Sequence, residues 1–335
     1  MLSRVADSLY WLGRYVERAE NVARFVDVNL HRLLDLPVDA DDGEQWEPLV
    51  AAAGDLALFR ERCGDATREH VIEFLTFDEQ NPNSIVSCVR AARENARSVR
   101  ETVSSEMWEQ VNTFYLRVTE AVFAHSHDRK ARFAENPHDF FTVVKTASHL
   151  FVGVMNATMA HGEGWHFCRL GRLMELADQT TRFLDVKYFI LLPDHAEVGT
   201  SYDDLEWAAV LRSASAFEMY RKRHGLLLPE RIADFLLLER AFPRSVRFCV
   251  VNAQGSLHEI TGTPLGEFRT EAERRLGQLR AELDFASTPE IILSGLHQYL
   301  DGMQQKLNRI DEAIYETCFA LQQSGESATD GREPQ

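Results

Sequence analysis

A seventeen-residue pattern occurs twice in this chain. Residues 12–28 read LGRYVERAENVARFVDV and residues 170–186 read LGRLMELADQTTRFLDV, with nine of the seventeen positions identical. Unrelated segments of this length would share about one identity, so the match points to an internal repeat. It predicts one structural unit that is used twice in a single chain.

The match continues beyond these segments. It predicts two units, at about residues 5–100 and 163–261, each with four or five helices followed by longer helices that diverge. A shift of 161 residues aligns further identical residues: Trp46 with Trp207, Gly64 with Gly225, Phe74 with Phe235, Pro82 with Pro243, Ser84 with Ser245, and Cys88 with Cys249.

The spacing of apolar residues predicts an all-α protein. Apolar residues recur at intervals of three and four, and most prolines stand between such stretches, near expected helix ends. We therefore predict a helical bundle built by internal duplication, with pseudo-twofold packing of two long Gly-Arg-x-x-Glu helices. Residues 1–322 would form a single domain, and the small polar residues 324–335 would form a disordered tail.

Charge and composition exclude several kinds of partner. The formal net charge is −16, which disfavours nucleic acid and anionic membrane surfaces because their phosphates would be repelled. Neither a secretory signal nor a membrane span is apparent, so we expect a cytoplasmic protein. The five scattered cysteines form no C-x-x-C pair and are expected to be reduced core thiols.

Each matching segment places a polar stripe along one helix face. Three interpretations stay open: a salt-bridge ladder, a charged interface fixing the register of the two halves, or a polar cavity between the two helices that binds a small molecule or metal. Glu17 and Glu175 are the carboxylate candidates for catalysis. The other members, including the neighbouring arginines, are Gly13, Arg14, Arg18, Glu20, Arg24 and Asp27 in the first segment, and Gly171, Arg172, Asp178, Arg182 and Asp185 in the second.

Two further features occur in only one unit. One helix face carries Arg90, Arg93, Arg97 and Arg100, which would suit an anion or pair with the protein's own carboxylates. Before the second stripe lies a histidine-containing segment in which His161 and His166 are candidates for acid–base chemistry or ligand contact. The alternative for these histidines is an ordinary structural role.

Motifs for cofactor or metal chemistry are not evident. The sequence lacks a Gly-rich phosphate loop, a Ser-His-Asp constellation and a C-x-x-C ligand set. Di-metal bundles pair glutamates with Glu-x-x-His, and the stripe has no histidine at that spacing. We therefore predict neither a cofactor nor a metal.

Three stretches together resemble the bacterial alpha-E domain family, a predicted helical domain with a Glu-Arg motif. They are the first repeat segment, the run NPNSIVSCVRAARENARSVRETVSSEMWEQVN, and the second repeat segment with FPRSVRFCV. The resemblance spans about residues 1–320. It maps the Glu-Arg pair onto Glu17-Arg18, whereas the second segment has Glu175-Leu176. The family's Arg-Glu-Asn-Ala-Arg run maps onto Arg93 to Arg97.

The resemblance implies a partner. Members of this family are encoded beside or fused to a circularly permuted ATP-grasp-type protein, often with a transglutaminase-like protease, a context associated with peptide or amide synthesis and modification. This favours a helical partner of a ligase that presents or shapes a polar substrate site. The alternatives are a stand-alone enzyme with a carboxylate, arginine and histidine site between the repeats, and a structural scaffold.

Overall fold

The computed structural model describes residues 1–34, 42–127, 137–190 and 201–320, and these residues form helices and turns without a strand. The predicted all-α class is therefore confirmed for the described residues. The first half contains α1 (Ser3–Leu34), α2 (Asp42–Ala53), α3 (Leu56–Cys63), α4 (Arg68–Thr76), α5 (Ile85–Ser98), α6 (Ser105–His127) and α8 (Pro137–Thr158). The second contains α9 (Glu163–Ile190), α10 (Ser201–Ser213), α11 (Phe217–His224), α12 (Pro229–Leu238), α13 (Val246–Thr261), α14 (Glu271–Phe285), α15 (Thr288–Ser294), α16 (Leu296–Ile314) and a π-helical turn (Tyr315–Phe319).

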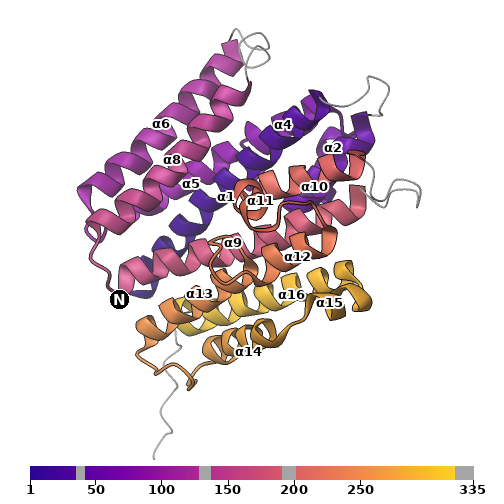
Figure 1. Ribbon diagram of the computed structural model, residues 1–335. Helices are drawn as coiled ribbons and strands as arrows, with labels where there is room; N and C mark the ends of the chain where they lie inside the picture. Colours follow the sequence, from indigo (N-terminus) through magenta and orange to yellow (C-terminus); the bar gives the residue numbers. More distant parts are fainter. Residues whose placement is uncertain (35–41, 128–136, 191–200, 321–335) are drawn as a thin grey trace, which may run out of the picture.

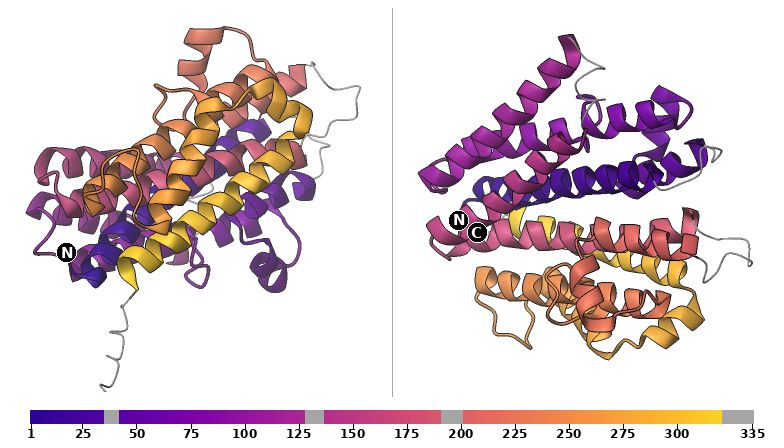
Figure 2. Two further views of the ribbon diagram at one scale, coloured as in Figure 1. Left: turned by 90° about the horizontal axis from the view of Figure 1, so that it is seen from below. Right: turned by 45° about the horizontal axis from the view of Figure 1, so that its top comes forward.

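The long helices α1 and α9 form the centre of the bundle, where they pack against each other (Figures 1 and 2). Helix α5 packs on α1, and α13 packs on α9. Outside them, α6 and α8 pair on one side, and α14 and α16 pair on the other. These outer pairs lie on opposite sides of the α1–α9 contact, whereas α2 of the first half packs on α9 and α10 of the second half packs on α1.

Local sequence explains these helices. In α1 the apolar residues that recur at intervals of three and four, among them Leu9, Leu12 and Val16, are buried. Helices α5 and α13 begin alike: the Ser84 hydroxyl accepts a hydrogen bond from the Ser87 amide, and the Ser245 hydroxyl accepts one from the Phe248 amide. Such N-caps satisfy backbone donors that the first helical turn leaves unpaired.

Two glycines allow the central helices to touch backbone to backbone. A Cβ added at Gly13 would overlap the carbonyl oxygen of Cys168, and a Cβ added at Gly171 would overlap the carbonyl oxygen of Tyr10. Only glycine permits an approach this close. The crossing point is therefore set by the first residue of each Gly-Arg-x-x-Glu motif.

Other predictions about the chain have mixed outcomes. Among the described residues, no helix is both long enough and apolar enough to cross a membrane. Cys88, Cys168 and Cys249 are buried and Cys63 and Cys318 half-buried, and all five thiols are free. The predicted tail at 324–335 lies outside the described residues, and the division into one domain of residues 1–322 stays a prediction.

Candidate functional site

Glu175 lies at the centre of the α1–α9 contact and is 0% exposed. Arg14 Nε donates to Glu175 Oε2 at 2.9 Å, while Arg18 donates from Nε to Oε1 at 2.7 Å and from Nη2 to Oε2 at 2.9 Å. Burial disfavours the charged carboxylate, but attraction to Arg18 and Arg14 outweighs it and lowers the pKa of Glu175 to about 2. Glu175 is therefore a fixed anion held by two guanidinium groups.

The groups around this cluster hold both arginines in place. Arg18 Nη1 donates to Asn83 Oδ1 at 2.6 Å, and Asn83 Nδ2 donates to Asp55 Oδ1 at 2.8 Å. Arg14 also pairs with Asp311 of α16 and lies over the Trp11 ring, 5.1 Å from its centroid. The cluster thus joins α1 and α9 to the start of α5 and to α16.

Glu17 faces the same interface from α1 and is 2% exposed. Arg172 Nη1 lies 3.6 Å from Glu17 Oε2, and Arg244 Nη2 donates to Glu17 Oε1 at 3.1 Å. Arg244 Nη2 is closer to both oxygens of Glu20, at 2.6 Å. Two carboxylates therefore compete for one guanidinium.

This competition changes the protonation of Glu17. Burial, followed by the negative charge of Glu20, raises the pKa of Glu17 to about 7, against the opposing attraction of Arg244 and Arg172. Glu20 is buried too, but Arg244, a hydrogen bond from His149 and Arg24 together hold its pKa well below the usual range. At neutral pH the pair can share one proton, which resides on Glu17.

Glu175 and Glu17 each have two arginine neighbours, but the second arginine lies on a helix for Glu175 and in a loop for Glu17. Leu176 stands at the position aligned with Arg18, so the second segment lacks that arginine. Arg244 stands at the position aligned with Asn83 and supplies the missing charge to Glu17. The arginine that α9 lacks at position 176 thus has a counterpart in Arg244, in the loop before α13.

The remaining stripe residues bind partners inside the protein. Arg24 Nη2 donates to Glu20 at 2.5 Å, and Arg182 Nε donates to Asp178 at 2.7 Å. Farther along the helices, Lys145 Nζ of α8 donates to Asp27 Oδ2 at 2.7 Å, and His297 Nδ1 of α16 lies 2.7 Å from Asp185 Oδ1. The stripes face each other near Glu17 and Glu175, and their later residues face α8 and α16.

The arginine face of α5 is paired within the protein. Arg90 bridges to Glu79, while Arg93 and Arg97 both bridge to Glu94. Arg93 also lies over the Tyr115 ring, 4.8 Å from its centroid. The prediction that Arg100 shares this helix face is wrong: α5 ends at Ser98, and Arg100 lies in the turn that follows, over the Trp108 ring at 5.1 Å from its centroid. These contacts match the interpretation in which the arginines neutralise the protein's own carboxylates.

The histidine candidates lie away from the carboxylates. His161 stacks on Trp165, with 4.2 Å between ring centroids, and its Nε2 contacts the Asn156 carbonyl oxygen at 3.1 Å. His166 precedes Glu175 by nine residues on α9, about 13 Å along the axis. The structure therefore does not bring His161 or His166 together with Glu17 or Glu175.

Sequence analysis missed several residues of the network. Arg244 sits in FPRSVRFCV, and comparison with the aligned Asn83 could have identified it as an added charge. His138 and His297 stand near the starts of α8 and α16, where each contacts a stripe aspartate. Their distance in sequence from the stripe gave no signal of that contact.

The comparisons place the chain in a family. Residues 1–319 match the Alpha-E family, described as a predicted alpha-helical domain with a conserved ER motif. The chain belongs to this family.

Its similar relatives include an uncharacterised protein of Mycobacterium bovis and two of Mycobacterium tuberculosis. Each is 24% identical over 341 residues, which covers 95% of this chain and 37% of the relative. This Alpha-E chain thus spans well under half the length of the curated relatives it matches. No solved structure matches it.

Proposed function

We propose that this Alpha-E chain is a helical partner of a circularly permuted ATP-grasp-type ligase in peptide or amide synthesis or modification, with a transglutaminase-like protease as a second partner. The observation that carries the proposal is the burial and pairing of the stripe. Glu175 is shielded from solvent and its oxygens accept three arginine hydrogen bonds. A general base needs a lone pair that can reach a substrate, so this carboxylate suits a framework better than a catalyst.

The length of the relatives supports a partner role. The region similar to this chain makes up 37% of each mycobacterial relative, so there it is joined to a longer stretch of other sequence. A helical region that works beside another domain fits that arrangement. In this proposal the Alpha-E chain shapes the polar site at which the ligase binds its substrate.

We further propose that the two matching segments arose by duplication and pack about a pseudo-twofold axis. The contacts that support this are reciprocal. Gly13 faces Cys168 while Gly171 faces Tyr10, and each pair joins aligned positions with the roles exchanged. Arg14 with Glu175 and Arg172 with Glu17 form a second reciprocal set of two ion pairs between α1 and α9.

The family's ER motif maps in this proposal onto Glu17-Arg18. These two neighbours serve different clusters, because Arg18 binds Glu175 while Glu17 binds Arg172 and Arg244. One dipeptide thus contributes to both halves of the buried network. A structural function of the motif, that of fixing the register of α1 on α9, follows directly from these contacts.

A stand-alone enzyme is the second candidate, and one observation favours it. Glu17 has a pKa raised to about 7 by burial and by Glu20, as suits a group that exchanges a proton at neutral pH. Beside it, the buried Nε of Arg172 and the buried Nδ2 of Asn21 have no hydrogen-bond partner among the described residues. A pure scaffold is the third candidate.

Reconstitution separates these candidates. The full chain is copurified with the ATP-grasp-type protein, and ATP-dependent amide formation is measured with and without it. We expect the two proteins to form a stable complex, and we expect the Alpha-E chain to change the yield or identity of the ligase product. The Glu17→Gln variant should produce the same change. Loss of product formation in a folded Glu17→Gln protein would favour the stand-alone enzyme. If the chain neither binds the ligase nor changes its activity, the scaffold is the remaining candidate.

A further inference from the structure

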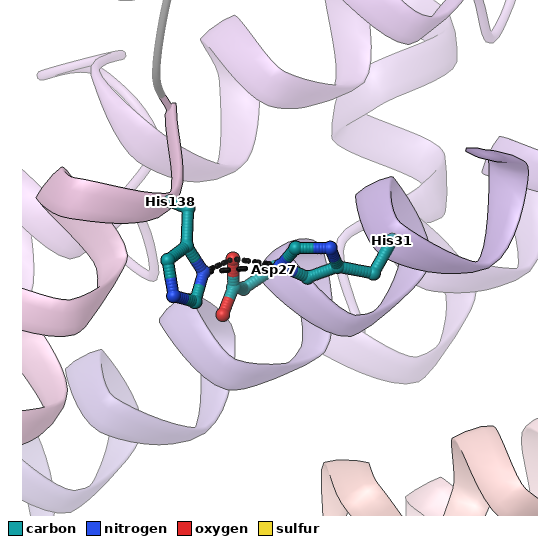
Figure 3. Close-up of side chains that lie close together, drawn as sticks. All are labelled: Asp27, His31 and His138. Carbon is teal, nitrogen blue, oxygen red and sulfur yellow. Dashed lines mark hydrogen bonds and ion pairs between the residues drawn. The ribbon is translucent and has the colours of Figure 1, made fainter.

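A group of three metal-ligating side chains lies at the far end of the α1 stripe, where α1 meets the start of α8. Asp27 and His31 are one helical turn apart on α1, and His138 is the second residue of α8 (Figure 3). Asp27 is ten residues beyond Glu17, about 15 Å along the helix, so this group is separate from the arginine–carboxylate network.

One atom of each side chain points to a common centre. His138 Nδ1 lies 2.9 Å from Asp27 Oδ1, His31 Nε2 lies 3.1 Å from His138 Nδ1, and His31 Nε2 lies 3.8 Å from Asp27 Oδ1. A tetrahedral Zn²⁺ with bonds of about 2.0 Å holds its ligand atoms about 3.3 Å apart. The observed separations bracket this value, so one ion could bind all three atoms after small side-chain movements.

Hydrogen bonds among these three side chains do not satisfy all three facing atoms. If His138 Nδ1 carries a proton and donates to Asp27, then His31 Nε2 must either share that same proton or turn a second N–H toward it. The 3.8 Å separation leaves His31 Nε2 too far from Asp27 for a hydrogen bond of its own. A cation at the centre would satisfy three lone pairs at once.

The surroundings orient two of the ligands. Lys145 Nζ donates to Asp27 Oδ2 at 2.7 Å, which leaves Oδ1 for the centre. The other ring nitrogen of His138, Nε2, lies 3.3 Å from Thr142 Oγ1, an oxygen that can accept its proton. Metal-bound histidines commonly donate their second ring N–H to such an oxygen, which fixes the tautomer.

The second half of the chain contains a similar aspartate–histidine contact but lacks a counterpart of His31. Asp185 aligns with Asp27 and contacts His297 at the start of α16, much as Asp27 contacts His138 at the start of α8. The position aligned with His31 holds Phe189. The aspartate–histidine contact therefore occurs in both halves, and His31 is the addition that completes a ligand set.

We propose that Asp27, His31 and His138 bind a zinc-like divalent transition-metal ion that joins α1 to α8. Two imidazoles and one carboxylate suit Zn²⁺, and three protein ligands leave a fourth position for water or a ligand group. The Asp27 side chain is 5% exposed, while His31 and His138 are 56% and 48% exposed, so the ion is reached from solvent.

Metal titration of the full chain tests this site. Protein stripped with a chelator is titrated with Zn²⁺ against a chromogenic competitor, and with Co²⁺ to record its visible absorption. We expect one ion per chain, an intense band typical of tetrahedral Co²⁺, and a higher melting temperature with Zn²⁺. His31→Phe should weaken Zn²⁺ binding by at least about 100-fold and remove the band, since even an indirect partner of a metal ligand is worth 10–100-fold.

The second half supplies the matched control. His297→Ala removes the corresponding histidine at Asp185 and should leave Zn²⁺ affinity within about twofold of the unmodified protein. Because the His31 side chain is largely in solvent, His31→Phe should fold, as circular dichroism can verify. Binding of less than one ion per chain, or equal affinity in His31→Phe, would overturn the proposal.

Discussion

Glu175 and Glu17 occupy aligned positions in the two matching segments, and both are buried at the α1–α9 contact. Glu175 accepts hydrogen bonds from both Arg14 and Arg18, and its pKa is lowered to about 2. Glu17 shares Arg244 with Glu20, and its pKa is raised to about 7 by burial and that neighbouring charge. Two aligned side chains thus acquire opposite behaviour, because Glu175 accepts three arginine hydrogen bonds while buried Glu17 has Arg172 at 3.6 Å and shares Arg244 with Glu20.

The sharpest test of this difference is to neutralise each glutamate in turn. Glu175→Gln leaves Arg14 and Arg18 without their shared anion, so we expect a loss of about 3–5 kcal/mol in the free energy of unfolding. Glu17→Gln should cost about 1 kcal/mol or less at pH 7, because Glu17 is close to half protonated there and Glu20 still binds Arg244. Urea denaturation at pH 7 measures the free energy of unfolding of both variants. Equal losses would contradict the difference between Glu175 and Glu17.

The placement of the second arginine gives the next test. Arg18→Leu copies the residue found at position 176, and we expect it to destabilise the protein by about 3 kcal/mol. Adding Asn83→Arg copies the aligned Arg244, and a guanidinium there should recover at least half of that loss. The control is Asn83→Arg alone. A double variant no more stable than Arg18→Leu would show that the two arginine positions are not interchangeable.

Gly13 and Gly171 are positions at which the two matching segments should respond equally to substitution. Because an added Cβ meets a backbone carbonyl at both positions, Gly13→Ala and Gly171→Ala should each cost about 2–3 kcal/mol. Gly153→Ala on α8 is the control: nothing lies near an added Cβ there, so a small gain is expected. Thermal unfolding compares the three, and a large difference between Gly13→Ala and Gly171→Ala would break the reciprocal arrangement.

The pH dependence of stability should have opposite signs for the two carboxylates. The folded pKa of Glu17 is raised from 4.5 to about 7, so its contribution is full below pH 4.5 and is lost as pH rises toward 7. Glu175, with its folded pKa lowered, contributes above pH 4.5 and loses that contribution as pH falls toward 2.

Denaturation of the unmodified protein and Glu17→Gln between pH 5 and pH 8 isolates the first effect. The unmodified protein should lose stability relative to the variant, by up to about 1 kcal/mol per pH unit below pH 7. The two proteins differ only at position 17, so the difference between their pH profiles reports on Glu17 and its coupling to Glu20. A difference that is constant with pH would show that Glu17 keeps an ordinary pKa.

Much of the network followed from helix periodicity. The stripe residues were expected to share a face, and Arg14, Glu17, Arg172 and Glu175 do meet across the helices. Asp27 and His31 stand at a spacing of four, which differs from the Glu-x-x-His pattern of di-metal bundles and does not by itself indicate a metal site. Even at that spacing the third ligand, His138, lies 111 residues away from Asp27. Local spacing cannot reveal a contact of that kind.

Local spacing and repetition in the amino-acid sequence were enough to predict the helical class, the matching segments, and the glycines and charged residues that share one helix face. The tertiary structure decided which arginine meets which carboxylate, and therefore which glutamate is a fixed anion and which can hold a proton. Arg244 reaches Glu20 across 224 residues of chain. A buried pKa depends on every charge that folding brings within a few ångströms, and that neighbourhood exists only once the helices have packed.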